Sequence, residues 1–295
     1  TDEHGFYRAF LPQSSYQISA RASGYSYEGG GDFPNEGYVN LRPNKTATVD
    51  IALPATGILR VVSVDQNGTP LAAKTSVVGH GKSPDPGVID SIAGFIDAFG
   101  RYFGYPPAEK DSDTFVLAAV LFSDYSGDTG DVEVEPGNYH IVVSHGNEYD
   151  VYDQAVTISA GQTTTVNATV NQVVDSTGFV SIDTHVHMIM SPDSAVPKQQ
   201  RITTMLAAGV DFFVPTDHDL VHDLEDDVAA MGASAYVKTA PSNEVTTFTY
   251  GHFNVWPQTV DESSIIGGAI DWGRGPGYPS AGAYDLSPAE IFASF

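Results

Sequence analysis

The sequence predicts a multidomain protein: two all-β sandwich modules followed by a partial β/α domain. The first observation is an internal repeat, because the pattern of residues 39–53 returns in residues 156–170 and indicates two copies of one β module. The second is a change near Gly178, after which strand patterns alternate with a helix pattern, as in domains with parallel strands. The expected boundaries are a partial sandwich over 1–55, a second sandwich over 56–173 and the β/α domain over 174–295.

Short strand patterns separated by turn signals make up the first module. They cover residues 6–11, 16–22, 38–41 and 46–53. The alternation is clearest in the last of these, where Val49, Ile51 and Leu53 share one face and predict a half-buried strand. The second module has an additional front half, residues 57–78, so we expect the chain to begin inside a domain.

The second module carries an insertion between Ser83 and Asp113. Within it, a helix is predicted over residues 88–103, because apolar residues recur there at helical spacing. These residues are Ile89, Ile92, Ile96 and Phe99. Packing of the apolar face against a core is the expected role of this helix.

Further along the second module, oxygen-bearing side chains alternate from Asp124 to Asp131, in a spacing that loosely resembles a calcium loop. The series lacks the distal Glu that a calcium loop supplies as a bidentate ligand. An ordinary acidic turn is therefore favoured, with a calcium site as the alternative.

The composition limits the classes of partner and site. With 37 acidic and 13 basic residues the formal net charge is −24, and a surface of that sign repels nucleic acid. The chain has no cysteine, so a metal ion has to be held by His, Asp, Glu or backbone oxygen. The longest apolar run, residues 115–122, is too short to span a bilayer. We expect an acidic protein, secreted or at the cell surface, with no nucleic-acid partner and no membrane span.

The first strand of the β/α domain ends in a histidine pair. Residues 180–187 are strand-like and contain Asp183, His185 and His187, which alternate along the strand and so project from one side. Two imidazoles on one side of a strand can bind one metal ion. A single His-x-His motif is more often incidental, with both rings hydrogen-bonded or solvated, so this pair does not define a site by itself.

Further candidate ligands follow at the next strand ends. A helix predicted over residues 197–208 leads to a buried strand over 211–216, and His218 comes directly after that strand. Glu244 and His252 lie in two later segments with hydrophobic neighbours. Because β/α barrels gather their active-site groups at the carboxyl ends of strands, we expect these residues to converge with the histidine pair.

An ordered series of His, Asp and Glu residues thus runs through the β/α domain. It reads Asp183-x-His185-x-His187, Asp193, Thr216-Asp217-His218, Glu244 and His252. This series resembles the PHP (polymerase and histidinol phosphatase) superfamily, and the surrounding segments resemble its CehA/McbA-type metallohydrolase branch. The resemblance implies that the partial β/α domain is part of a distorted barrel of the PHP type. The two β modules resemble the carboxypeptidase-regulatory, transthyretin-like sandwiches, and members of that branch carry sandwich modules ahead of the catalytic domain.

The resemblance implies a set of metal ligands. They are His185, His187, Asp193, His218, Glu244 and His252. Glu244 would bridge two ions, and Asp183 and Asp217 would orient imidazoles from outside the coordination sphere. The implied ions are Zn, Mn or Fe, whose bound water would hydrolyse a phosphoester, amide or carbamate bond. His222 is expected to be a surface histidine outside this site.

The β/α domain is shorter than the resemblance requires. A β/α barrel uses about 250 residues, and the sequence stops before the later His and Asp/His motifs of the family. We therefore expect a fragment, or one half of a barrel completed by a second chain, with weak metal binding and little turnover by itself.

Two functions stay open at this point. One is a secreted metal-dependent hydrolase, active in its full-length form on an unknown small-molecule or polymer substrate. The other is a surface or filament structural protein, in which the sandwiches self-assemble and the C-terminal domain is a non-catalytic scaffold. Stoichiometric metal at His185 and His187 favours the first, whereas ordered polymers without metal favour the second.

Overall fold

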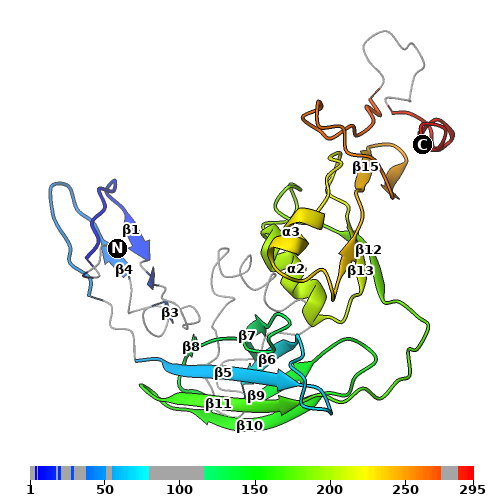
Figure 1. Ribbon diagram of the computed structural model, residues 1–295. Helices are drawn as coiled ribbons and strands as arrows, with labels where there is room; N and C mark the ends of the chain where they lie inside the picture. Colours follow the sequence, from blue (N-terminus) through cyan, green and yellow to red (C-terminus); the bar gives the residue numbers. More distant parts are fainter. Residues whose placement is uncertain are drawn as a thin grey trace.

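The computed structural model shows a β-rich protein with a sandwich and a separate C-terminal unit (Figure 1). The residues described are 4, 6–17, 19–20, 28–29, 38–50, 55–79, 116–273 and 285–295. The predicted insertion helix over 88–103 lies outside these residues. In the described helices, no stretch is long and apolar enough to cross a bilayer.

The N-terminal part forms two small antiparallel pairs. The strands are β1 (Ser15–Gln17) with β4 (Tyr38–Asn40), and β2 (Ser19–Ala20) with β3 (Glu28–Gly29). Residues 6–11 and 46–50 are irregular, so the strands expected there do not form in the described chain. None of the buried core residues found in the described chain precedes Leu59. Alternation can assign a face to a strand, but among the described residues these two segments join no sheet and add nothing to a buried core.

The second module is a sandwich of two sheets, as the sequence predicts. One sheet has the order β10-β9-β6-β7 and the other β11-β5-β8. Their bounds are β5 Gly57–Val64, β6 Lys74–Gly79, β7 Val116–Phe122, β8 Val132–Val134, β9 Gly137–Ser144, β10 Tyr152–Ile158 and β11 Thr163–Thr169. All pairings are antiparallel except that of β5 with β11, which is parallel and in register from Ile58 opposite Thr163 to Val64 opposite Thr169.

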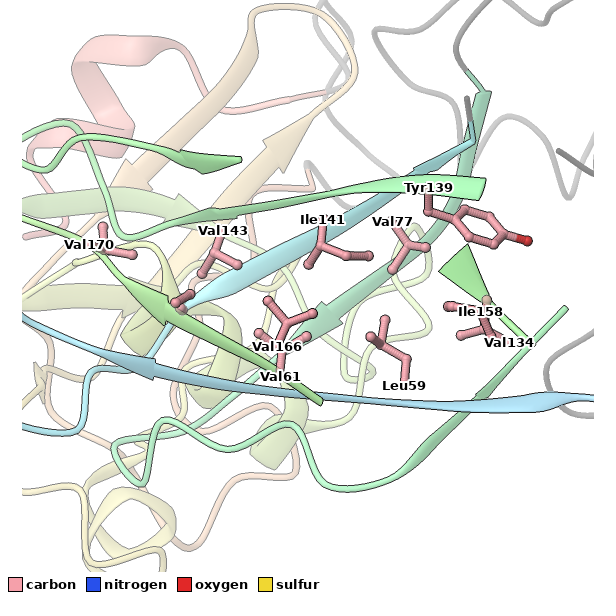
Figure 2. Close-up of a cluster of buried hydrophobic side chains, with 12 residues drawn as sticks. Leu59, Val61, Val77, Val134, Tyr139, Ile141, Val143, Ile158, Val166 and Val170 are labelled. Atoms are coloured by element: carbon pink, nitrogen blue, oxygen red, sulfur yellow. The ribbon is translucent and has the colours of Figure 1, made fainter. Parts of the chain in front are cut away.

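Inward-facing residues of both sheets fill the sandwich core (Figure 2). Leu59 and Val61 of β5 alternate with more exposed neighbours, and they face Val77 and Ile141 of the opposite sheet. All four are at most 1% exposed. Burying a side chain of this size stabilises the fold by about 1.5–3 kcal/mol.

The acidic segment from Asp124 to Asp131 is a turn whose carboxylates already have partners. Arg60 on β5 donates to both carboxylate oxygens of Asp128, and this contact holds the pKa of Asp128 below its usual value. Asp124 accepts a hydrogen bond from the backbone N–H of Ser126. These contacts favour the acidic turn over a calcium loop.

The C-terminal unit begins with a three-stranded parallel sheet, in the order β12-β13-β14. Its elements are β12 (Ile182–Val186), α2 (Lys198–Ala207), β13 (Phe212–Pro215), α3 (Glu225–Ala230) and β14 (Lys238–Thr239). The strands and helix predicted over 180–187, 197–208 and 211–216 are confirmed within a few residues. Gly209, with φ of +66°, follows the end of α2, where glycine readily adopts a left-handed conformation.

A hairpin and a last short helix complete the unit: β15 (Asn243–Thr247), β16 (Gly251–Val255) and α4 (Pro288–Phe292). Below the sheet, Ile202 and Leu206 of α2 pack against Phe213 of β13 in a second buried cluster. The strands in the described ranges form no closed barrel. The described part of the unit is a partial β/α domain built on a three-stranded parallel sheet, and the distorted-barrel type that the resemblance implies for it is not supported.

Side chains of the sandwich contact the C-terminal unit directly. The Tyr125 ring stacks on Tyr236 with 5.0 Å between centroids, and its hydroxyl donates to the Met231 carbonyl. Next to this contact, His145 Nδ1 lies 2.6 Å from the carbonyl oxygen of Ala72, a residue that itself belongs to the second buried cluster. The carbonyl can only accept, so Nδ1 carries the proton.

Acidification is expected to destabilise the protein through His145. Burial lowers the pKa of this imidazole, and the Ala72 carbonyl and Glu148 offset that effect in part. The unfolded chain, with a histidine pKa of about 6.5, then takes up a proton before the folded chain does, so stability is full above that pH and falls below it. The free energy of unfolding is measured in urea at pH 7.5 and at pH 5.5. His145→Asn keeps a donor for the Ala72 carbonyl but does not titrate, so its free energy of unfolding should fall less between these two pH values than that of the wild type. An equal fall in the variant and the wild type would contradict the role of His145.

Candidate metal centre

Six side chains from three segments meet at one end of the C-terminal unit. His185 and His187 lie at the end of β12, and Asp193 lies in the loop that follows. His218 follows β13, and Glu244 and His252 face each other from the two strands of the β15–β16 hairpin. All six residues predicted as ligands are thus brought together. They form three overlapping groups, in each of which the ligand atoms lie within 4.8 Å of one another. The groups are His185/His187/Glu244, His187/Asp193/His218 and His218/Glu244/His252.

Glu244 lies at the middle of the cluster, and its side chain is 4% exposed. Its Oε2 is 3.1 Å from His187 Nε2 and 3.2 Å from His218 Nδ1. A third nitrogen, His185 Nε2, is 3.5 Å away, and Oε1 is 2.9 Å from His252 Nδ1. Although Oε2 is buried, none of its contacts within the described chain has hydrogen-bond geometry. A buried carboxylate oxygen without a partner is costly, and a cation between it and the imidazoles would satisfy it.

The two histidines of β12 face each other through ring nitrogens. His185 Nε2 and His187 Nε2 are 2.9 Å apart, a gap that holds at most one proton. Burial lowers the pKa of His187, despite the nearby carboxylates of Asp193 and Glu244. His187 is therefore neutral at neutral pH, the form in which an imidazole binds a metal ion.

Asp193 closes the cluster on the side opposite Glu244. Its Oδ2 is 3.3 Å from His218 Nε2, and its Oδ1 is 3.6 Å from His187 Nδ1. Partial burial raises the pKa of Asp193, but the Ser191 hydroxyl and the two imidazoles outweigh burial and lower it. This carboxyl is therefore ionised, as a metal ligand has to be.

The segment after β13 is held beside β15 by Asp219. This residue adopts φ of +52°, which is uncommon for a side chain other than glycine. Its N–H donates to the Glu244 carbonyl, and its Oδ1 accepts from the Thr246 N–H and from Trp272 Nε1. His218 Nδ1 in turn lies 2.6 Å from the Thr246 hydroxyl. Sequence reasoning missed Asp219 and Trp272, because nothing in the sequence indicates a contact between residues so far apart.

Asp183 and Asp217 make contacts other than the ones expected. Asp183 Oδ1 accepts the backbone N–H of His185, and Asp217 Oδ1 accepts that of Met188. Asp217 Oδ2 lies 2.7 Å from His222 Nε2. Both carboxylates thus hold the backbone of the β12 end, and their described hydrogen bonds do not reach a ligand imidazole. The expectation of a surface His222 is wrong, because this side chain is 12% exposed and pairs with the fully buried Asp217.

No family model and no curated protein matches the sequence. Among solved structures, the chain is similar to GBS52, the minor pilin of Streptococcus agalactiae, at 20% identity over 40% of this chain and 45% of that chain, with a TM-score of 0.25. It is also similar to BcpA, the major pilin subunit of Bacillus cereus, at 17% identity over 40% of this chain and 31% of that chain, with a TM-score of 0.24. A third similar structure is the 3-chlorocatechol 1,2-dioxygenase of Rhodococcus opacus, at 12% identity over 41% of this chain and 62% of that chain, with a TM-score of 0.25. The matches span less than two thirds of each of these proteins, and TM-scores this low carry no argument about function.

These findings correct the family expected from the motifs. No family model of the PHP superfamily matches the sequence, and the similar solved structures include several pilins. The resemblance to the PHP superfamily, to its CehA/McbA-type branch and to the carboxypeptidase-regulatory sandwiches is therefore not upheld, and neither is the hydrolase activity that it implied. The physical reason is that short His and Asp motifs specify ligand geometry, and one ligand geometry can occur on unrelated folds.

Proposed function

We propose that the C-terminal unit binds divalent transition-metal ions through His185, His187, Asp193, His218, Glu244 and His252. The observation that carries this proposal is the buried Glu244 carboxylate, whose Oε2 lies within 3.5 Å of three imidazole nitrogens without a hydrogen bond to any of them. Nitrogen and oxygen donors of this kind suit Zn, Mn or Fe.

The donor set fits two ions better than three. A neutral imidazole has one unprotonated nitrogen and so serves one ion. If His187 joins His185 and Glu244, and His218 joins Glu244 and His252, two of the three groups are complete and share Glu244. The group His187/Asp193/His218 is then left without an ion, and Asp193 contacts the other ring nitrogens, His187 Nδ1 and His218 Nε2, so it orients both imidazoles from the side opposite Glu244. Ions bound in this way would tie the end of β12, the segment after β13 and the β15–β16 hairpin together.

Metal analysis of the purified protein tests this proposal. After loading with Zn, Mn or Fe and removal of free ions, we expect at least one tightly bound ion per chain by mass spectrometry of the metals. Metal loading should also raise the melting temperature, because an ion that binds the folded state stabilises it. Less than 0.1 ion per chain for all three metals would overturn the proposal.

We further propose that the protein is a structural component of the cell surface. Support comes from the modular β architecture, the cysteine-free acidic composition and the buried hydrophobic core of the sandwich. Pilin subunits such as GBS52 belong to this class of protein, although the proposal rests on the features of the chain itself. Self-assembly of the sandwiches is part of it. Protease added to intact source cells should degrade the protein, and full protection would contradict a surface location.

A further inference from the structure

A cavity of about 330 Å³ lies between the sandwich and the C-terminal unit, apart from the metal cluster. Its walls come from both parts of the chain. The sandwich contributes the segments around Pro70, Tyr125 and His145, and the C-terminal unit contributes those around Leu206 and Tyr236. Sites for small ligands occur preferentially at such junctions, and their volumes begin at about 300 Å³.

The charged groups of this cavity are all acidic. Glu148 and Asp211 line it, and no lysine or arginine is among its lining residues. Asp211 uses Oδ2 to accept the backbone N–H of Ser181. For the Glu148 carboxylate, no hydrogen bond or ion pair occurs within the described part of the chain. Both carboxylates therefore keep acceptor capacity for a ligand.

The one imidazole in the wall is also an acceptor toward the cavity. His145 donates from Nδ1 to the Ala72 carbonyl, so its Nε2 carries a lone pair. The charged and imidazole groups of the wall thus select a ligand that donates hydrogen bonds or carries positive charge. The net charge of −24 adds to this preference, because it raises the local concentration of cations.

Aromatic rings complete the wall. Tyr125 and Tyr236 stack at 5.0 Å, and Tyr149 meets the His145 ring edge-on at 4.7 Å. Phe179 stands at the rim and is 79% exposed. Ring faces attract cations, and a combination of rings and carboxylates suits an ammonium group better than a hydrated metal ion.

We propose that this cavity binds a small organic ammonium ion, with its charge near Glu148 and Asp211 and its apolar part against the tyrosine rings. The site is distinct from the metal centre and does not depend on it. Because its walls come from both parts of the chain, a bound ligand would also stabilise the packing of the sandwich against the C-terminal unit.

Calorimetric titration of the full chain with choline tests the proposal, and 3,3-dimethylbutan-1-ol serves as the uncharged analogue of the same shape. We expect saturable choline binding and at least ~10-fold weaker binding of the alcohol, since only choline carries a positive charge that the carboxylates and the ring faces attract. Glu148→Gln and Asp211→Asn should each weaken choline binding by about tenfold, because each removes one negative charge from the wall.

The control variant is Glu133→Gln, which removes one exposed carboxylate from β8 without touching the cavity wall. It should bind choline as the wild type does. Glu148→Gln is expected to fold normally, because the backbone carbonyl of Glu148, and not its side chain, accepts the hydrogen bonds of Val173 and Val174. Equal binding of choline and the alcohol, absence of saturable binding at millimolar choline, or equal weakening by Glu133→Gln would overturn the proposal.

Discussion

Replacing Glu244 by Gln is expected to lower the affinity of the C-terminal unit for divalent metal by more than about 100-fold. Residues that only orient a metal ligand contribute up to about 100-fold, and the loss of a ligand should exceed that. Glu244 belongs to two of the three ligand groups, so its loss affects both ion positions. The glutamine keeps the shape of the side chain and an oxygen that accepts from His252. The packing around position 244 should therefore survive the substitution.

The effect of this substitution on stability should depend on metal. Without metal, Glu244→Gln replaces a buried carboxylate whose Oε2 has no hydrogen bond within the described chain, so the variant should be as stable as the wild type or more stable. At a metal concentration of 100 times the wild-type dissociation constant, the wild type gains about 2.7 kcal/mol, whereas a variant that binds 100-fold more weakly gains about 0.4 kcal/mol.

Both tryptophans of the chain, Trp256 and Trp272, lie in the C-terminal unit, so urea unfolding followed by tryptophan fluorescence reports on this unit. The measurement is made with zinc and with a chelator. Glu133→Gln, at an exposed position on β8, is the matched control and should gain as much from zinc as the wild type does. If Glu244→Gln lowers the free energy of unfolding by several kcal/mol in the presence of the chelator, the carboxylate has a structural role and the metal assignment fails.

Cavity-forming substitutions in the two cores should destabilise different parts of the chain. Ile141 in the sandwich and Phe213 in the C-terminal unit are both 0% exposed and belong to separate buried clusters. Ile141→Ala is expected to cost about 2–5 kcal/mol and Phe213→Ala about 3–5 kcal/mol. These are among the largest effects that single substitutions have, because a fixed backbone cannot close around the missing side chain.

Two spectroscopic signals separate these effects. Phe213→Ala should shift the unfolding transition seen by tryptophan fluorescence, whereas Ile141→Ala should leave that transition nearly in place and shift the remaining transition in far-ultraviolet circular dichroism. Ile141→Val, with an expected cost of about 0.5–1.5 kcal/mol, provides a graded control. If both substitutions shift one common transition, the units 56–173 and 174–295 do not unfold independently of each other.

Local patterns in the sequence were sufficient to predict β12, α2 and β13, because each element is determined by alternation or helical spacing within a few residues. The convergence of the histidines at the ends of β12 and β13 was also predictable, since parallel strands bring their carboxyl ends to one edge. His185 and His218 are examples, as each comes at or just after the end of such a strand. Glu244 and His252 reach the cluster from near the starts of two antiparallel strands, which this rule does not cover.

Contacts that depend on the path of a loop were not predictable from one sequence. The buried pair of Asp217 and His222 depends on how the chain turns after β13, and the hydrogen bond from Trp272 to Asp219 joins two loops. The alternation in residues 46–53 gave a wrong prediction for its described part, because a half-buried strand needs a neighbouring sheet, and residues 46–50 join no sheet within the described residues. The family expected from the motifs failed for a similar reason, since ligand spacing constrains a site and leaves the surrounding fold undetermined.

The parallel pairing of β5 with β11 has a mechanical consequence. The chain enters β5 at Gly57 and leaves β11 at Thr169, at opposite ends of the pair. Tension applied through the flanking segments pulls the two strands lengthwise in opposite directions, so their hydrogen bonds are loaded together in shear. A hairpin pulled at its open end would lose the same bonds one at a time. A protein that links a cell to its surroundings would therefore resist extension at this strand pair.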